Sequence, residues 1–189
     1  MKLVKIWESD LKKAYELQMS FPQEETGFWN SAYEYTFEQF VEYTKSCEKH
    51  SQGLELPEGF VPATVFVLVD DDENYVGIFN LRHHLNEFLA KGPGHIGYGI
   101  SSKYRRMGYA TKGLELMLPE AKKIGIEEAY LSCLKTNVGS IKAQLNNGAK
   151  VHREDDLRYY TRIRSYRYLI IKRFEPHRTK RMKSGIFLL

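Results

Sequence analysis

Two absences narrow the interpretation of this sequence of 189 residues before any motif is considered. Its only cysteines, Cys47 and Cys133, are isolated ones, which indicates neither a disulfide framework nor a metal site. Long hydrophobic runs are also missing, since no apolar stretch approaches the ~18 residues that a membrane span needs. The first residues, "MKLVKIWESDLKK", carry charges every few positions and lack the apolar core of a secretory signal. We therefore expect a cytoplasmic protein with no bound metal and no membrane contact.

Charge is distributed unevenly along the chain. The formal net charge is +4, yet residues 150–183 hold 12 Lys/Arg against 4 Asp/Glu, so the preceding part is mildly acidic. A basic end of this kind can bind nucleic acid or another anion, but it is more often a solvated strand face followed by a tail. Because no nucleic-acid-binding motif accompanies the charge, we do not expect a nucleic-acid partner.

Hydrophobic periodicity predicts one domain with alternating types of element, and 42% apolar residues are enough for its core. Strands are expected at 2–8, 63–70, 75–83, 95–101, 127–135, 150–155 and 164–174. Helices are expected after Ser9 or Asp10, after Thr36, at 109–125 and at 137–148, with a short helix or loop at 85–94. The order β-α-α-β-β-β-α-β-α-β-β predicts a mixed α/β (α+β) sheet flanked by helices.

The most informative segment is "YRRMGYATKGLEL", which joins the strand at 95–101 to a helix. Backbone N–H groups at a helix start, with the positive end of the helix dipole, form a site for phosphate oxygens. Gly108 and Ala110 keep side chains away from that site, and two arginines add charge. A basic turn before an amphipathic helix is the alternative. Gly97 and Gly99 in the preceding strand predict a bulge that would open a slot into the sheet.

Together with the element order, this segment resembles the GNAT superfamily of acetyl-CoA-dependent N-acetyltransferases, in particular a bacterial branch of predicted, largely uncharacterised members. The family loop R/Q-x-x-G-x-G/A is matched by Arg105, Gly108 and Ala110, and its asparagine after the fifth strand by Asn137. The resemblance covers residues 2–173 and implies a mostly antiparallel central sheet. It divides the chain into a GNAT-like domain at 1–174 and a basic tail at 175–189.

The resemblance also implies how acetyl-CoA binds as co-substrate. The loop would hold the pyrophosphate mainly through backbone N–H groups, and the strand before it would hold the pantetheine arm and stabilise the thioester oxyanion. Asn137 and Ser140 would contact the arm from the far side. The coenzyme-binding residues expected on this basis are Tyr98, Gly99, Ile100, Ser101, Arg105, Arg106, Met107, Gly108, Tyr109, Ala110, Thr111, Asn137 and Ser140.

One position departs from the family pattern. Many members have a tyrosine seven residues after the asparagine, where it can protonate the departing thiolate, and this chain has Gln144 there. Glutamine cannot serve as that acid, so the role is vacated, taken by another tyrosine or filled by water. Tyr159, Tyr160 and Tyr166 are candidates because the last strands flank the slot in folds of this family, and we take Tyr160 as the candidate acid. Cys133 could be read as a nucleophile, but a buried structural cysteine is the better interpretation.

A side chain or ordered water must take the proton of the acceptor amine, and a histidine suits this task because imidazole titrates near neutrality. His95 starts the strand that would carry the thioester and is the first candidate. His84 ends the neighbouring strand and is the second, and Glu87 is weaker. Both histidines could equally be ordinary strand residues.

In folds of this family the acceptor side is built by the first two helices, their connection and the final hairpin. That connection, at 21–40, mixes glutamates with aromatic residues, which attract cations. Glu25, Trp29 and Tyr33 are the expected contacts for an amine-bearing substrate, although a solvated acidic loop would look similar. The sequence thus predicts an enzyme that acetylates a primary amine of a small molecule or peptide by direct attack in a ternary complex. A non-catalytic acyl-CoA-binding regulatory module is the alternative, and a homodimer is left open.

Overall fold

The computed structural model describes residues 1–164. The strand expected at 164–174, apart from its first residue, Tyr166 among the candidate acids and the tail expected at 175–189 lie outside the described residues. Within the described part, no helix has the length and apolar character to cross a membrane. Nor do three or more histidine, cysteine or acidic side chains gather there in a way that could hold a metal ion.

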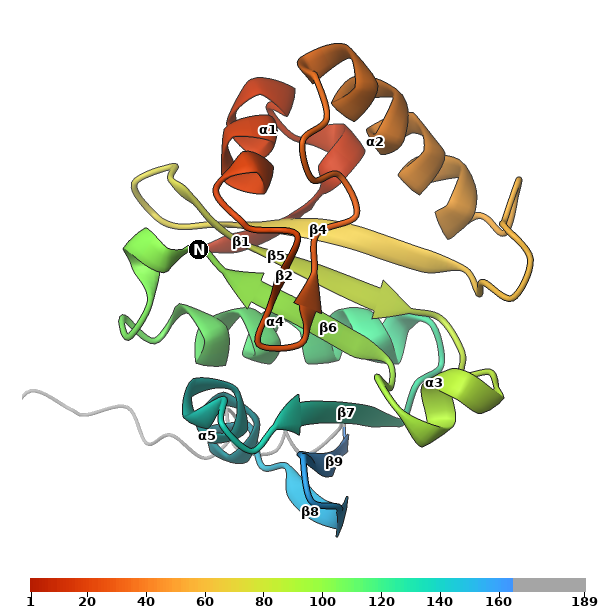
Figure 1. Ribbon diagram of the computed structural model, residues 1–189, viewed down its shortest axis with the longest axis vertical. Coiled ribbons are helices and arrows are strands. Elements are labelled where there is room, and N and C mark those ends of the chain that lie inside the picture. Colours follow the sequence, from red (N-terminus) through yellow and green to blue (C-terminus); the bar gives the residue numbers. More distant parts are fainter. Residues whose placement is uncertain (165–189) are drawn as a thin grey trace, which may run out of the picture.

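Antiparallel strands form two sheets that lie next to each other (Figure 1). The first sheet has the order β1-β4-β5-β6 and the second the order β7-β9-β8. Their bounds are Lys2–Lys5 for β1, Ala63–Val69 for β4, Tyr75–Arg82 for β5, Ile96–Ile100 for β6, Glu128–Leu134 for β7, Lys150–Glu154 for β8 and Arg158–Arg164 for β9. A small separate hairpin consists of β2 (Glu24–Glu25) and β3 (Phe28–Trp29).

Helices cover both faces of the first sheet. Helices α1 (Leu11–Met19) and α2 (Phe37–Ser51) pack on one face, and α4 (Tyr109–Lys123) packs on the other (Figure 1). The remaining helical elements are α3 (Glu87–Lys91), α5 (Val138–Asn146) and the 3₁₀ turns η1 (Ile6–Glu8) and η2 (Ser102–Tyr104). Polar side chains cap the first turns of the two N-terminal helices. Asp10 accepts hydrogen bonds at the start of α1, and Thr36 forms a capping box with Gln39 at the start of α2.

The core is divided by the first sheet into two layers. Phe79 of β5 packs with Leu114 and Met117 of α4, whereas Ile78 of the same strand packs with Phe40 of α2. Adjacent residues of a strand point to opposite faces, so this alternation follows from the pleat. Residues of β5 at even positions therefore face α1 and α2, which places Asn80 and Arg82 on that face.

Within the described part of the chain, the residues just before β6 join the first sheet to the middle of β7. Gly94 forms an isolated bridge with Leu131, and the N–H of His95 donates to the carbonyl of Tyr130 at 2.6 Å. Gly94 has φ +75°, and a Cβ there would lie 2.2 Å from the Tyr130 oxygen, so only glycine allows this approach. Beyond the bridge the strands separate (Figure 1).

The predicted slot is thus present, but the predicted bulge is not. The register between β5 and β6 is continuous from the Leu81–Ile96 pair to the Gly77–Ile100 pair. The prediction of a bulge at Gly97 and Gly99 is therefore wrong. The slot arises because β6 pairs with β5 along its length and touches β7 at one end.

The predicted fold class and element order are confirmed, with three local differences. Strand β1 ends at Lys5, where a 3₁₀ turn replaces the rest of the expected strand at 2–8. The hairpin of β2 and β3 was not predicted from the sequence. Strand β9 was not predicted either, and it supplies the middle of the second sheet.

Candidate functional site

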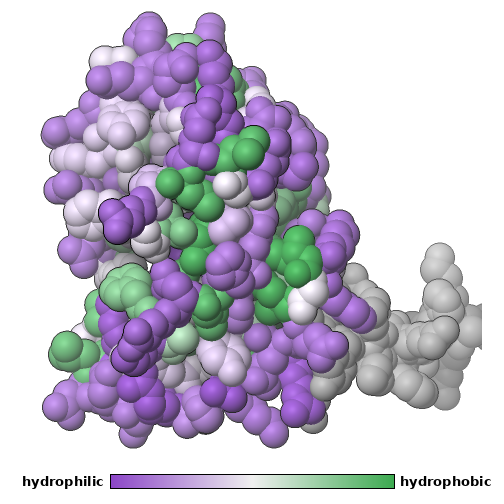
Figure 2. Space-filling view, turned by 90° about the vertical axis from the view of Figure 1, so that its right-hand side faces the viewer, coloured by the Kyte–Doolittle hydropathy of each residue, from purple (hydrophilic) through white to green (hydrophobic). Residues whose placement is uncertain are grey.

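A cleft of about 1430 Å³ crosses the region where the two sheets separate. It is lined by the start of α4, by β6, by the β2–β3 hairpin, by the start of α5 and by the end of β5. Its aromatic rim is exposed: Trp29, Phe60 and Phe88 show 59%, 69% and 73% of their surfaces to solvent. Figure 2 looks at the side of the molecule that carries α3 and shows hydrophobic surface gathered in its middle. The cleft is large enough to hold more than one small molecule.

The start of α4 faces this cleft with bare backbone. Gly108 caps the helix in the left-handed conformation, with φ +84°, and no atom lies within 4 Å of where its Cβ would be. The first N–H groups of an α-helix have no partner within the helix. Tyr109, Ala110 and Thr111 supply such groups and line the cleft together with Arg106. This end of α4 can therefore bind an anion such as a pyrophosphate.

Arg105 is used differently from the prediction. Its Nη1 and Nη2 donate to the two carboxylate oxygens of Glu25 at 2.7 and 2.5 Å, and its Nε donates to the Ile100 carbonyl at 3.0 Å. The Arg105 hydrogen bonds lower the pKa of Glu25. A bidentate pair of this kind fixes geometry as well as charge. It ties the β2–β3 hairpin to the loop before α4, so the predicted coenzyme ligand and the predicted acceptor ligand bind each other.

The β2–β3 hairpin spans the slot between the sheets. At its turn, the Oγ1 of Thr26 accepts a hydrogen bond from the Nδ2 of Asn137 at 3.2 Å. On its second strand, Phe28 packs over Gly99, where a Cβ would lie 3.0 Å from the ring. Figure 1 shows the hairpin reaching from α1 and α2 across β6. Trp29 lines the cleft, as predicted for the acceptor side, whereas Tyr33 is exposed and does not line it.

A buried polar chain crosses the slot from β6 to α5 and β9. The hydroxyl of Tyr98 lies 2.9 Å from the Oγ of Ser140, and the Nε2 of Gln144 donates to that same Oγ at 3.1 Å. The Oε1 of Gln144 accepts from the Oγ1 of Thr161 at 2.6 Å. Gln144 is fully buried. The residue that replaces the family tyrosine is therefore a structural bridge between α5 and β9.

The ring of Tyr98 is held rigidly in this slot. It stacks on Phe79 with ring centroids 5.2 Å apart. Burial raises the pKa of Tyr98 to about 12. The phenol consequently keeps its proton at neutral pH within the slot.

Asn137 and Cys133 have the structural surroundings that the sequence indicated. Asn137 caps α5, its Oδ1 accepting from the N–H of Ser140 at 3.0 Å. Cys133 is buried on β7, and burial raises the pKa of its thiol. A buried thiol with a raised pKa is a poor nucleophile, which agrees with the structural interpretation.

The histidines expected to act as base do not face the cleft. His95 is buried, and its Nδ1 accepts the N–H of Tyr130 at 3.0 Å, so the ring proton is on Nε2. Burial, Arg82 and His84 lower the pKa of His95 to about 4. His84 is exposed at the end of β5 and does not line the cleft. This geometry does not fit the predicted role of either histidine as the base.

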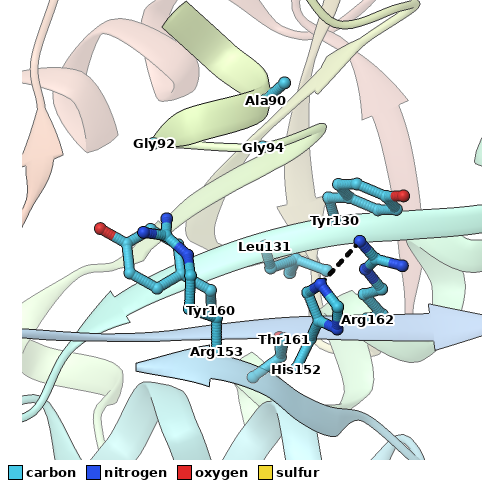
Figure 3. Close-up of a pocket in the computed structure, with 10 residues that line it drawn as sticks. All are labelled: Ala90, Gly92, Gly94, Tyr130, Leu131, His152, Arg153, Tyr160, Thr161 and Arg162. Atoms are coloured by element: carbon cyan, nitrogen blue, oxygen red, sulfur yellow. Dashed lines mark hydrogen bonds between the residues drawn. The ribbon is translucent and has the colours of Figure 1, made fainter. Parts of the chain in front are cut away.

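Tyr160 sits at the edge of the cleft but is engaged elsewhere. Its hydroxyl donates to Asp155 in the turn before β9 at 2.7 Å, and this bond raises the pKa of Tyr160. The guanidinium of Arg153 stacks on its ring at 3.7 Å. Figure 3 shows these two side chains together in a second, smaller cavity of about 110 Å³, on the opposite side of Leu131 from His152 and Arg162. The predicted role as acid therefore does not fit the hydroxyl of Tyr160.

Most of the predicted coenzyme residues come together, and two important residues were missed. Of the predicted set, Ser101 and Met107 do not line the cleft, since Ser101 is buried and accepts a hydrogen bond from the hydroxyl of Ser20 at 3.1 Å. The missed residues are Asn80 and Arg82, which line the cleft from β5. Their signal in the sequence is weak but present, because Asn80 and Arg82 are the polar residues of the otherwise apolar run "VGIFNLR".

Comparison with known proteins agrees with this geometry. The family model described as an acetyltransferase (GNAT) domain matches residues 2–150. The match confirms both the resemblance predicted from the sequence and the enzyme class, an acetyl-CoA-dependent N-acetyltransferase. No curated protein matches the chain in sequence.

Solved structures share the fold at low sequence identity. A chimera of the spermidine N-acetyltransferase SpeG from Vibrio cholerae and hSSAT has a TM-score of 0.61 at 14% identity, covering 89% of this chain and 99% of its own. Campylobacter jejuni N-acetyltransferase PseH, solved with acetyl coenzyme A, has a TM-score of 0.55 at 15% identity over 86% and 97%. The Microcin C7 self-immunity acetyltransferase MccE, solved with acetyl-CoA and AMP, has a TM-score of 0.59 at 14% identity over 86% and 92%.

Proposed function

Because the chain belongs to the GNAT acetyltransferase family, we propose that it transfers the acetyl group of acetyl-CoA to a primary amine of a small molecule or peptide within a ternary complex. The observation that carries this proposal is the continuity of one cleft. It joins the left-handed cap at Gly108, where an anion can bind, to Asn80 and Arg82 on the opposite face of the sheet. Two substrates entering from these two sides would meet at β6.

On the coenzyme side, the N–H groups of Tyr109, Ala110 and Thr111 hold the pyrophosphate, with Arg106 adding charge. The pantetheine arm enters the slot between β6 and β7, where the backbone of β6 has no strand partner on that side. Ser140 and Asn137 lie across the slot and complete its far wall. The free N–H groups of β6 stabilise the oxyanion of the tetrahedral intermediate.

The reaction is a direct transfer in which no covalent acyl-enzyme forms. The amine nitrogen attacks the thioester carbonyl, a C–N bond forms, and the C–S bond breaks with its electron pair on sulfur. The amine loses one proton and the thiolate gains one, so the products are an N-acetylated amine and free CoA. The raised pKa of the buried Cys133 thiol is consistent with a route that does not pass through this cysteine.

Tyr98 is the proton donor that this arrangement favours. Its hydroxyl lies in the slot, opposite the α5 residues that would contact the arm, and it is protonated at neutral pH. This assignment replaces the role predicted for Tyr160.

The amine proton leaves through water in this proposal. Among the described residues that line the cleft there is no histidine, and the single carboxylate there, Glu25, is bound at both oxygens by Arg105. An amine that enters in its neutral form needs no strong base.

A turnover assay separates this function from the alternative of a non-catalytic acyl-CoA-binding module. Purified protein is incubated with acetyl-CoA and a panel of amines, and release of free CoA is followed together with the acetylated product by mass spectrometry. Amine-dependent CoA release with matching product supports the enzyme. Tight binding of acetyl-CoA by calorimetry without turnover of any amine supports the binding module.

A further inference from the structure

The acceptor half of the cleft carries a positive charge that no acid neutralises. Arg82 leaves the end of β5 on the face covered by α1 and α2, and its side chain is half-buried. Its Nη1 donates to the Gly94 carbonyl at 3.0 Å. Among residues 1–164, none of the ion pairs includes Arg82. A guanidinium has five N–H donors, so most of this one remains available to a ligand.

The carboxylate that could neutralise the charge of Arg82 already forms an ion pair with another arginine. Glu25 is the one acidic residue that lines the cleft in the described part of the chain, and Arg105 holds both of its oxygens. The charge of Arg82 is instead one of the causes that lower the pKa of His95. A partly desolvated cation without a counter-charge is costly to keep, so such an arrangement is typical of a site whose ligand supplies the charge.

Arg82 and Gly97 line the cleft together. Gly97 lies next to the guanidinium on β6, and a Cβ at Gly97 would be 3.7 Å from Nη2 and 3.8 Å from Nη1. The missing side chain leaves this space to a ligand. Gly97 is also the residue before Tyr98, so the space lies beside the part of β6 that would hold the thioester.

Asn80 offers the complementary group beside this space. It pairs with Gly97 across β5 and β6 and shares its face of the sheet with Arg82. Its Oδ1 is buried and has no hydrogen-bond partner. A buried acceptor of this kind costs free energy until a donor reaches it. The cleft is thus lined by Arg82, which has free N–H donors, and by Asn80 two residues earlier on β5, whose unpaired oxygen lies just beneath the surface.

We propose that the acceptor substrate is an amine that also carries an oxyanion, either a carboxylate or a phosphate. Arg82 binds the oxyanion, and Asn80 accepts an N–H of the amine and directs its nitrogen toward β6. This inference rests on the proposed acetyl transfer and adds its substrate class. It also replaces the expectation that glutamates of the connection at 21–40 attract the amine. Glu25 instead holds the hairpin in place.

Matched pairs of amines test this inference. L-phenylalanine is compared with L-phenylalaninamide, and O-phosphoethanolamine with ethanolamine, at saturating acetyl-CoA. In at least one pair the anionic member should have a kcat/KM about ten- to a hundredfold higher, since a hydrogen-bonded charge is worth that factor in affinity. The first pair supports a carboxylate and the second supports a phosphate. Equal rates in both pairs, or faster neutral members, would overturn the inference.

Variants of Arg82 test whether this residue causes the preference for anionic amines. Arg82→Gln should abolish the preference by raising the KM of the anionic amines, with acetyl-CoA affinity unchanged, and Arg82→Lys should retain part of the preference. Arg153→Gln is the matched control, because Arg153 contacts Tyr160 outside the acceptor half. A preference that survives in a folded Arg82→Gln protein contradicts the inference.

Direct binding separates this inference from the function on which it rests. Calorimetry with CoA present measures the affinity of L-phenylalanine and of O-phosphoethanolamine without any turnover. If the wild type binds either anion and Arg82→Gln does not, the anion site is supported even when no acetylated product forms. The lack of product would then count only against the proposed acetyl transfer. Absence of binding by both anions, or equal binding to wild type and Arg82→Gln, overturns the anion site whether or not other amines are acetylated.

Discussion

Replacing His95 distinguishes a buried structural histidine from a catalytic base. The ring is buried, its Nδ1 accepts the Tyr130 N–H at 3.0 Å, and it lies where β6 meets β7. Its protonation would have to break that hydrogen bond beside Arg82. His95→Gln removes the titration and retains a side-chain oxygen that can accept the same N–H.

The size of the effect of His95 on the free energy of unfolding follows from its lowered pKa. In the unfolded chain His95 binds a proton near its ordinary pKa of 6.5, whereas in the native protein it stays neutral down to about pH 4. Between these values the unfolded state binds more protons, so the free energy of unfolding falls as the pH falls. The contribution is complete above pH 6.5 and is lost as the pH falls through 4. At about 1.4 kcal/mol per pKa unit, this loss is roughly 3 kcal/mol.

Urea unfolding at several pH values between 4 and 7 measures this contribution. The difference between wild type and His95→Gln in unfolding free energy should shrink by that amount as the pH falls, whereas exposed His152→Gln should track the wild type. The pH dependence of kcat should be the same in His95→Gln and wild type, because the ring does not face the cleft. A rate that falls a hundredfold in the folded variant and recovers at high pH would refute this reasoning and restore His95 as the base.

Two further substitutions test the slot. Gln144→Ala removes the partner of the buried Thr161 hydroxyl and leaves a cavity, so the free energy of unfolding measured in urea should fall by about 2–4 kcal/mol, while Gln144→Tyr should lose about 1–3 kcal/mol by overpacking. Unchanged urea midpoints would show that the buried bridge is not needed. Tyr98→Phe keeps the stacking on Phe79 but removes the hydroxyl, so kcat should fall about 10²–10⁴-fold with acetyl-CoA affinity nearly constant. An unaltered kcat would show that water, and not Tyr98, protonates the departing thiolate.

Local signals explain what could be predicted from the sequence. The run "ATVFVLVD" followed by a turn predicted β4 and β5, and Thr36 predicted the start of α2, because strand propensity and capping act within a few residues. The start of α4 beside Gly108 was predicted for the same reason, since a glycine before a helix is visible in the sequence.

The features that could not be predicted from the sequence depend on contacts between residues far apart in the chain. Strand β9 is recognisable only from its pairing with β7 and β8, since "RYYTRIR" by itself alternates weakly. The pair of Glu25 with Arg105 joins residues 80 positions apart, and the cavity beside Arg82 depends on the register of β5 with β6. The role of Gln144 likewise needed its partner Thr161 on β9.

Binding of acetyl-CoA to variants at the two ends of α4 tests the central claim most directly. Gly108 and Gly125 flank this helix with φ values of +84° and +86°, and both have open space where a Cβ would be. Aspartate at either position therefore introduces the same backbone strain and the same charge. By isothermal titration, Gly108→Asp should abolish measurable acetyl-CoA binding, whereas Gly125→Asp should bind like the wild type. Equal affinity in folded Gly108→Asp and Gly125→Asp proteins would contradict the placement of the coenzyme at the start of α4.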